Sequence, residues 1–298
     1  MVMCIGLFAC GSVILLVMGV GHTLPAEEEI IFSAHHGYSI YRLALARNLV
    51  APVLSTKNSL SQPSWSADGQ HIAFVNNSTA QLTLYIADAD GRNKQLLTSR
   101  PDTSDYDPQW SPDGRFIAYS TSSHDSANNW VINVMLMDTQ TQIRQVLTST
   151  NIFREHMLSW SPDGSQIALV LYSADRRNSD LFSLNVQSGA IHNLASTEGN
   201  DEYPVWSPDG RYIVFVGGSS PRGLYVLDTT TGQPSMIYSQ SGVIYPSDWS
   251  QDSRFIFFTV VNNIYKLEVA SCLKNPSTCT PELLIKGGED ARRKPRTP

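Results

Sequence analysis

The chain has 298 residues, of which 42% are hydrophobic and 16% are charged, and its formal net charge at pH 7 is −6. The apolar content can fill a large core, so the composition excludes a disordered chain and a coiled coil. The negative net charge provides no field that attracts a phosphate backbone, which argues against a nucleic-acid partner.

The first 26 residues differ in composition from the rest of the chain. They contain no Asp, Glu, Lys or Arg, and residues 5–20 are almost uniformly apolar. This pattern is typical of an export signal, cleaved after Ala26, or of a membrane anchor over residues 4–20. We therefore expect export to the periplasm or another extracytoplasmic compartment, with membrane contact only through an uncleaved leader, and a single domain over residues 27–298.

The remaining cysteines form one pair near the C-terminus. Cys4 and Cys10 lie in the leader, whereas Cys272 and Cys279 flank a six-residue segment. In an oxidising compartment Cys272 and Cys279 are expected to form a disulfide, and two reduced thiols are the alternative. The pair lacks neighbouring His or carboxylate ligands, so no metal site and no cofactor are predicted.

A tryptophan motif recurs along the chain at intervals of 45, 50, 46 and 43 residues. Five of the six tryptophans lie on this grid, which indicates one repeated structural unit. Most copies read Trp-Ser-Pro-Asp-Gly, and the last has decayed. The repeat tryptophans are Trp65, Trp110, Trp160, Trp206 and Trp249, and the turn aspartates are Asp68, Asp113, Asp163 and Asp209.

Each motif precedes short segments with strand patterns. The first such strand is predicted over residues 70–75, 115–120 and 211–216, and the next over residues 82–86, 181–184, 224–227 and 264–267. A further strand follows over residues 95–98 and 145–148, after turn residues. The chain has no long helical pattern, so each unit is predicted to be a small sheet of four antiparallel strands.

The Ser-Pro-Asp-Gly step is predicted to be a hairpin turn. Proline presets φ for the second turn position, aspartate bonds local amides, and glycine accepts a positive φ. The preceding tryptophan offers a flat surface for packing one sheet on the next. Four short strands in each period of about 45 residues are typical of an all-β propeller.

The motif, followed by strands such as Ile72-Ala73-Phe74, resembles the TolB-type propeller repeat, a WD40-like (PD40-type) repeat. The resemblance covers nearly everything after the leader and implies six blades. The same repeat resembles the propellers attached to prolyl-oligopeptidase and dipeptidyl-peptidase hydrolases, so it predicts fold better than function.

The first blade is expected to be assembled from both ends of the chain. Residues 29–34, 39–44 and 52–56 are predicted as its second, third and fourth strands, without an inner first strand. The mean spacing of 46 places the missing strand near residue 295, within residues 294–298. The basic residues of this tail, Arg292, Arg293, Lys294 and Arg296, favour solvent over an innermost strand, so a solvated tail is the alternative.

Carboxylates stand five residues before three of the tryptophans, at Asp105, Glu155 and Asp201. At the start of the innermost strands they are expected to form an acidic rim of the central channel, with His156 beside Glu155. Such a rim suits a cation or a basic protein segment. The alternative is that these side chains cap turns in solvent.

The two longest loops, residues 121–130 and 173–180, are expected on the same face as this rim. They carry Trp130, Arg176 and Arg177, and Trp and Arg dominate interface energetics. The alternative for Trp130 is burial at the start of the strand that follows it.

Neither a Gly-x-Ser-x-Gly elbow nor a metal-binding histidine pair occurs in the sequence. We therefore predict a non-catalytic, monomeric propeller that binds a protein of the cell envelope. The resemblance implies a partner such as a peptidoglycan-associated lipoprotein. One alternative is a metal-dependent lyase or hydrolase site at His156, Glu155, Asp105 and Asp201. The other is a carbohydrate-binding module that uses Trp130, Tyr172 and Tyr203.

Overall fold

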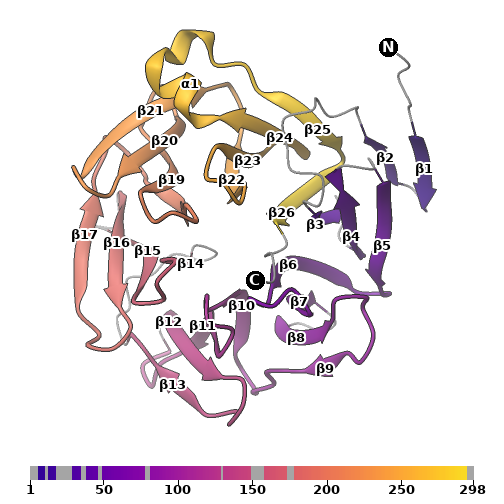
Figure 1. Ribbon diagram of the computed structural model, residues 1–298. Helices are drawn as coiled ribbons and strands as arrows, with labels where there is room; N and C mark the ends of the chain where they lie inside the picture. Colours follow the sequence, from indigo (N-terminus) through magenta and orange to yellow (C-terminus); the bar gives the residue numbers. More distant parts are fainter. Residues whose placement is uncertain are drawn as a thin grey trace.

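The computed structural model describes residues 6–10, 13–17, 29–34, 38–45, 49–77, 81–128, 130–148, 158–172 and 178–293. Six antiparallel sheets are arranged in a ring, each with its first strand toward the central axis (Figure 1). The six-bladed propeller of four-stranded sheets predicted from the repeat is confirmed.

Successive blades follow one another along the chain, and the strands of each blade run in order from the innermost outward. The first contains β26 (Gly288–Arg293), β3 (Glu29–Ala34), β4 (Ser39–Ala44) and β5 (Leu49–Ser55). The second contains β6 (Ser59–Trp65), β7 (His71–Asn77), β8 (Thr83–Asp88) and β9 (Gln95–Leu96). The third contains β10 (Ser104–Trp110), β11 (Phe116–His124), β12 (Trp130–Asp138) and β13 (Arg144–Val146).

The other three blades repeat this order. The fourth contains β14 (Ser159–Trp160), β15 (Gln166–Tyr172), β16 (Ser179–Asn185) and β17 (Ile191–Ala195). The fifth contains β18 (Glu202–Trp206), β19 (Tyr212–Gly217), β20 (Gly223–Asp228) and β21 (Gln233–Ser239). The sixth contains β22 (Ile244–Trp249), β23 (Phe255–Val260), β24 (Asn263–Glu268) and β25 (Glu282–Lys286).

The core lies between neighbouring blades. The second strand of a blade is the most continuously apolar, and all six residues of β23 are buried. This is expected where a sheet is covered on both faces. Buried clusters join adjacent blades, as when Ile31 of the first blade packs with Phe74 of the second. Another cluster joins Phe257 of the sixth blade to Phe32 of the first, so hydrophobic packing closes the ring.

The first blade draws its innermost strand from the C-terminal part of the chain. β26 pairs with β3 from Gly288↔Ala34 to Arg293↔Ile30. This strand begins earlier than the sequence spacing predicts, and residues 294–298 lie outside the described residues. Arg293 stands in the register position that the other blades give to tryptophan, two residues before position 295.

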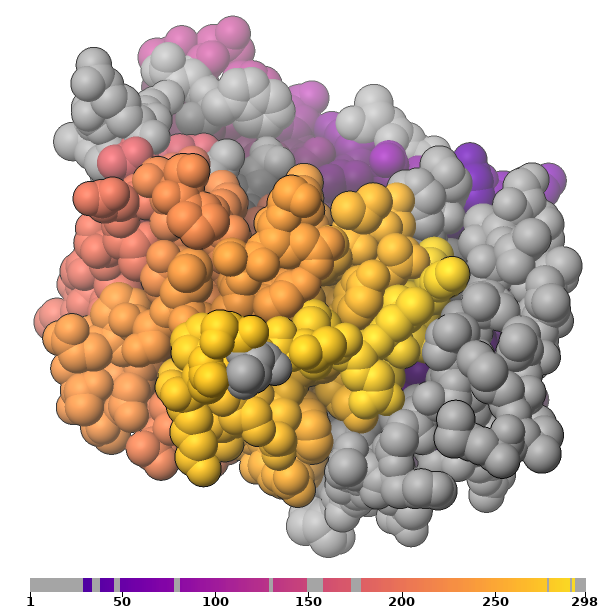
Figure 2. Space-filling model, turned by 90° about the horizontal axis from the view of Figure 1, so that it is seen from above, coloured from indigo at the N-terminus to yellow at the C-terminus, as the bar shows by residue number. Residues whose placement is uncertain are grey.

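A short helical segment connects β24 to β25. It comprises α1 (Val269–Lys274) and η2 (Pro276–Thr278), which lie at the outer edge of the sixth blade (Figure 2). Cys272 and Cys279 are joined by a disulfide with Cα atoms 5.0 Å apart. Val269 and Cys272 are buried against the fifth and sixth blades, so the segment extends the core at this interface.

Part of the predicted leader is described as a hairpin of β1 (Gly6–Cys10) and β2 (Val13–Val17). β2 pairs with β25 at the outer edge of the sixth blade, which makes that sheet six-stranded. Within the described residues, neither helix has the length and apolar character needed to cross a bilayer. The assignment of residues 1–26 as an export signal or anchor stays a prediction.

Candidate functional site: the central channel

The Ser-Pro-Asp-Gly turns define one face of the ring, which we call the turn face. In each described copy the serine hydroxyl donates to the aspartate, as from Ser161 to Asp163 at 2.6 Å. The same aspartate oxygen accepts the backbone amide two residues later, from Ser165 at 3.0 Å. The decayed copy keeps this bond between Ser250 and Asp252, and Ser253 takes the positive φ of 58° that glycine adopts elsewhere. The turn chemistry therefore depends on the Ser-x-Asp pair.

The opposite face, which we call the loop face, carries the starts of the first strands and the loops between second and third strands. Three first strands contain a bulge in which a residue with positive φ precedes proline. These residues are Gln62, Asp107 and Tyr203, with φ between 52° and 58°. A bulge re-aims the side chains beside it, and these three side chains line the channel.

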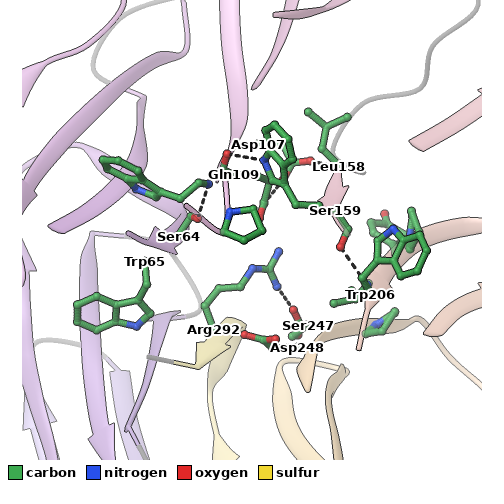
Figure 3. Close-up of a pocket in the computed structure, with 17 residues that line it drawn as sticks. Ser64, Trp65, Asp107, Gln109, Leu158, Ser159, Trp206, Ser247, Asp248 and Arg292 are labelled. Carbon is green, nitrogen blue, oxygen red and sulfur yellow. Dashed lines mark hydrogen bonds between the residues drawn. The ribbon is translucent and has the colours of Figure 1, made fainter. Parts of the chain in front are cut away.

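Hydrogen bonds link the bulges from blade to blade. The Gln62 side-chain oxygen accepts a hydrogen bond from the Asp107 backbone amide at 2.9 Å. The Asp107 carboxylate accepts one from the Leu158 backbone amide at 2.7 Å (Figure 3). Asp107 is buried, and its other oxygen accepts a hydrogen bond from the side-chain Nε2 of Gln109 at 3.0 Å. The inner wall of the channel is therefore fixed in the second, third and fourth blades before any ligand binds.

The inner part of the channel is a cavity of about 220 Å³. Each of the six blades contributes the residue that follows its bulge or precedes its tryptophan. This ring comprises Ser64, Gln109, Ser159, Val205, Asp248 and Arg292. The Arg292 side chain extends across the cavity and donates to the carbonyl of Ser247 (Figure 3). Among these described lining residues, the C-terminal strand thus supplies the one cation.

A second cavity of about 330 Å³ lies at the loop-face end of the channel and shares Asp107, Tyr203, Ser247 and Arg292 with the first. Tyr203 and Tyr245 meet there edge to face, with ring centroids 4.7 Å apart. We call this cavity the channel mouth. It combines aromatic rings with a cation and a carboxylate in one concave surface.

Exposed apolar side chains lie beside the channel mouth. Val243 is 55% exposed, Val261 is 64% exposed and Tyr245 is 38% exposed. All three belong to the loop-face end of the sixth blade, where a Cβ added at Gly242 would touch Val261 at 3.5 Å. Exposed apolar groups next to a cavity are a feature of binding surfaces.

Asp105 and Asp201 do not lie where the acidic rim was expected. Asp105 is 3% exposed and Asp201 is fully buried, and neither lines the channel cavities. Asp201 accepts the Thr197 amide at 2.8 Å and the Thr197 hydroxyl, so it ties the start of β18 to the preceding blade. Burial raises the pKa of Asp201.

Asp105 has a comparable position in the third blade. Its amide donates to the carbonyl of Leu82 in the second blade at 2.9 Å. Burial, together with the charge of Asp105, raises the pKa of Tyr119 to about 12. Five residues before the tryptophan, the chain is still crossing between blades, which explains why these carboxylates face the interface rather than the axis.

Several predicted site residues lie outside the described residues, namely Glu155, His156, Arg176 and Arg177. Trp130 starts β12, but its side chain is also outside them. β11 extends to His124, so the loop predicted over residues 121–130 is shorter than expected. Tyr172 ends β15 and does not line the channel cavities, whereas Tyr203 does. No group of three His, Cys, Asp or Glu side chains suited to a metal occurs within the described part of the chain.

Sequence reasoning missed Arg292, Asp107 and Tyr245 as channel residues. Arg292 lies at the channel because the bulge between Glu289 and Arg292 turns the strand, which strand periodicity does not predict. Proline directly after Asp107 was an available indication, because it marks an interruption of the first strand. Tyr245 lies at an ordinary strand position, and nothing in the sequence separates it from other strand tyrosines.

Comparison with protein families decides the membership of the chain. The model of the TolB β-propeller domain family matches residues 76–292. The chain belongs to the TolB β-propeller family. Dipeptidyl-peptidase 5 of Porphyromonas gingivalis is 32% identical over 93 residues, which is 27% of this chain and 13% of the peptidase. The match therefore spans a small part of that enzyme.

Solved structures share the fold at low identity. TolB from Acinetobacter baumannii superposes with a TM-score of 0.74 and 17% identity, over 90% of this chain and 66% of TolB. A chain of a nidogen–laminin complex gives 0.67 at 14% identity, over 90% and 98% of the two chains. Oligogalacturonate lyase from Vibrio parahaemolyticus gives 0.60 at 12% identity, over 95% and 85%. At these identities the likeness concerns the fold alone.

Proposed function

We propose that this TolB-family chain is an exported, non-catalytic propeller that binds a protein partner at its channel mouth. The observation that carries the proposal is the combination, in one concave surface, of the Tyr203–Tyr245 pair, the Arg292 guanidinium and an exposed apolar border. Tyrosine and arginine are enriched among the few residues that carry most of the binding energy at protein interfaces, and such residues cluster near the centre of the interface.

The neighbouring side chains favour a polypeptide over a compact small molecule. Val243 and Val261 extend the apolar surface beyond the cavity itself, and Glu289 and Arg292 offer both signs of charge at its wall. A segment of a partner can place an apolar side chain in the cavity while its backbone and charges pair around it. Export is supported by the uncharged, apolar composition of residues 1–26.

The proposal is tested by photo-crosslinking in cells that make the full chain. A photoreactive phenylalanine analogue replaces Tyr245, and a matched control carries it at Val146, which is exposed on the outer strand of the third blade. We expect one dominant protein adduct from position 245 and none from position 146. The adduct should fall at least about tenfold when Val261→Asp is added. Equal labelling from both positions, or none from position 245, would contradict the proposal.

The enzymatic alternative has its own measurement. The alternative is a hydrolase or a metal-dependent lyase, and it rests on the similarity to dipeptidyl-peptidase 5 and to oligogalacturonate lyase. Native mass spectrometry of the full chain after incubation with manganese or zinc separates these classes. A stoichiometric metal adduct that is lost in Glu155→Gln or His156→Ala protein would favour the lyase. Absence of an adduct is expected for the binding protein.

A further inference from the structure

The side chain six residues after a repeat tryptophan packs toward the tryptophan of the next blade. Between the fifth and sixth blades, Tyr212 stacks on Trp249 with ring centroids 6.3 Å apart and planes inclined by 11°. Between the third and fourth blades, Phe116 packs in the cluster that buries Trp160. We call these two contacts the closed interfaces.

At the closed interfaces the indole is buried and anchored. Trp160 is 9% exposed and Trp249 is fully buried. Their indole nitrogens donate to the carbonyls of Gln109 and Val205 in the preceding blades, each at 3.0 Å. An aromatic neighbour and a hydrogen bond therefore hold each ring inside the interface.

The two alternate interfaces differ at the same position. Between the second and third blades the neighbour is His71, whose ring lies 6.5 Å from that of Trp110 and is inclined to it by 30°. Between the fourth and fifth blades the equivalent position holds Gln166, which lines the same cavity as Trp206. The facing tryptophans, Trp110 and Trp206, are half-buried. Within the described residues, their indole nitrogens have no hydrogen-bond partner. At these two interfaces the indole therefore lies beside a polar side chain, and no hydrogen bond from the described residues anchors it.

We call the interfaces at His71 and at Gln166 the open interfaces. Each contains a groove on the turn face. The groove between the second and third blades has a volume of about 560 Å³, and the groove between the fourth and fifth blades about 590 Å³. Both volumes are in the usual range for ligand pockets. We call them the His71 groove and the Gln166 groove. The turns of two successive blades form their walls, with Trp110 or Trp206 between them.

The two grooves have the same chemistry. Each combines a flat indole and a proline ring with two turn aspartates and a threonine hydroxyl. The Gln166 groove adds the carboxamides of Gln166 and Asn193, and the His71 groove adds the imidazole. Lys and Arg are absent from both sets of described lining residues, so anionic ligands are disfavoured.

The aspartates are preset as acceptors of hydrogen bonds. Oδ1 of Asp209 accepts from the Ser207 hydroxyl at 2.6 Å and from the Arg211 amide at 3.1 Å. Asp113 accepts in the same way from Ser111 and Arg115, at 2.5 and 3.0 Å. These bonds fix the orientation of each carboxylate, while Oδ2 of each has no partner within the described residues. A fixed acceptor of this kind suits a hydroxyl donor.

We propose that the His71 and Gln166 grooves bind pyranose rings of a neutral glycan. The apolar face of such a ring can lie against the indole, and its hydroxyls can donate to the aspartates and pair with the carboxamides or imidazole. The two grooves lie two blades apart on one face, so one branched or extended glycan could occupy both with a gain from multivalency. This face is opposite the channel mouth, and the proposal is independent of the protein partner.

The experiment uses the full chain with soluble trisaccharides of glucose and of N-acetylglucosamine as probes. Binding is read from saturation-transfer difference NMR of the sugar and from tryptophan fluorescence. His71→Phe and Gln166→Phe install the aromatic neighbour of the closed interfaces and should fill the grooves without loss of fold. Tyr212→Phe, at a closed interface, is the matched control.

We expect saturable binding of at least one trisaccharide by the wild-type chain and by Tyr212→Phe. Each single phenylalanine variant should weaken binding, and the double variant should weaken it at least about tenfold. Circular dichroism and thermal unfolding establish that the variants are folded. Absence of binding to every probe, unchanged binding in the folded double variant, or competition by a lysine-rich peptide alone would overturn the proposal.

Discussion

The fifth blade contacts its two neighbours in opposite ways. Toward the sixth blade, Tyr212 and Trp249 stack and the indole is fully buried. Toward the fourth blade, Gln166 faces Trp206, the indole is half-buried and a groove of about 590 Å³ remains. Both contacts arise from the same repeat position. The two interfaces thus differ in the side chain at this position and in whether a ligand-sized groove remains.

The difference does not depend on the turns, which are built alike at both interfaces. Ser161 and Asp163 make the same bond as Ser250 and Asp252, at 2.6 Å in each case. The repeat therefore has a part that is the same at both interfaces and a position that varies. The turn and the backbone ladder preserve the blade, whereas the side chain after the turn varies the interface.

Removing the indole should give the largest difference in stability between the closed and the open interfaces. Trp249→Ala empties a fully buried position and should lower the free energy of unfolding by about 3–5 kcal/mol. Trp206→Ala removes a half-buried, unanchored ring, and its cost should be about half as large or less. Urea unfolding of both variants gives the comparison. Equal losses would show that the open and closed interfaces do not differ energetically.

The disulfide belongs to the closed interface, where Cys272 is buried against the fifth and sixth blades. Replacing Cys272 and Cys279 with serine removes the constraint on the loop between them and should cost about 2.5 kcal/mol. The fluorescence of Trp206, which lies in the Gln166 groove, should not change. Thermal unfolding with and without reductant measures the first effect, and a shift in groove fluorescence would contradict the assignment of the disulfide to one interface.

Tyr212→Gln gives the closed interface the neighbour found at an open one. Loss of the stacked ring should lower the free energy of unfolding by about 1–2 kcal/mol. Trp249 should also become accessible to acrylamide, which quenches exposed tryptophan fluorescence. Tyr212→Phe keeps the ring and serves as control. An unchanged quenching constant in the glutamine variant would mean that another contact determines closure.

A change in the shared turn should have the weakest consequence. The hydrogen bond from Ser161 holds the pKa of Asp163 below its usual range. Because the folded-state pKa is lowered, the stabilisation is present above the ordinary aspartate pKa of about 3.9 and is lost as pH falls through the lowered value. Asp163→Asn should cost less than about 1 kcal/mol at neutral pH.

The same variant should converge with the wild-type chain in acid, where the wild-type carboxyl is protonated. Urea unfolding between pH 7 and the acid limit of folding measures this convergence. A difference between the two proteins that grows on acidification would reverse the expected sign.

Much of the architecture was predictable because it is local and repeated. Tryptophan spacing and the Ser-Pro-Asp-Gly turn predicted four-stranded blades, and the resemblance to the TolB-type repeat implied six of them. Strands such as β7 and β19 lie close to their predicted ranges. The first blade was predicted from both ends of the chain, but its inner strand is β26 rather than residues 294–298. A bulge shifts register without changing composition, so spacing alone could not place that strand.

The candidate sites were less predictable. Asp105 and Asp201 were expected at the channel from their place before the tryptophans, yet they contact neighbouring blades. Solvent exposure was the alternative considered for Arg292, but its side chain lies across the channel. In each case the direction of a side chain depends on bulges and on the crossing between blades, which strand periodicity does not encode.

Residues that are close in the chain were enough to specify the blade, because turn geometry and strand alternation are local properties. What the blades enclose depends instead on the assembled ring. The indole of Trp249 is buried beside Tyr212 and that of Trp206 is half-buried beside Gln166, and each pair joins residues about 40 positions apart in the chain. Hydrophobic packing is not directional, so such a pairing is settled only when the ring closes.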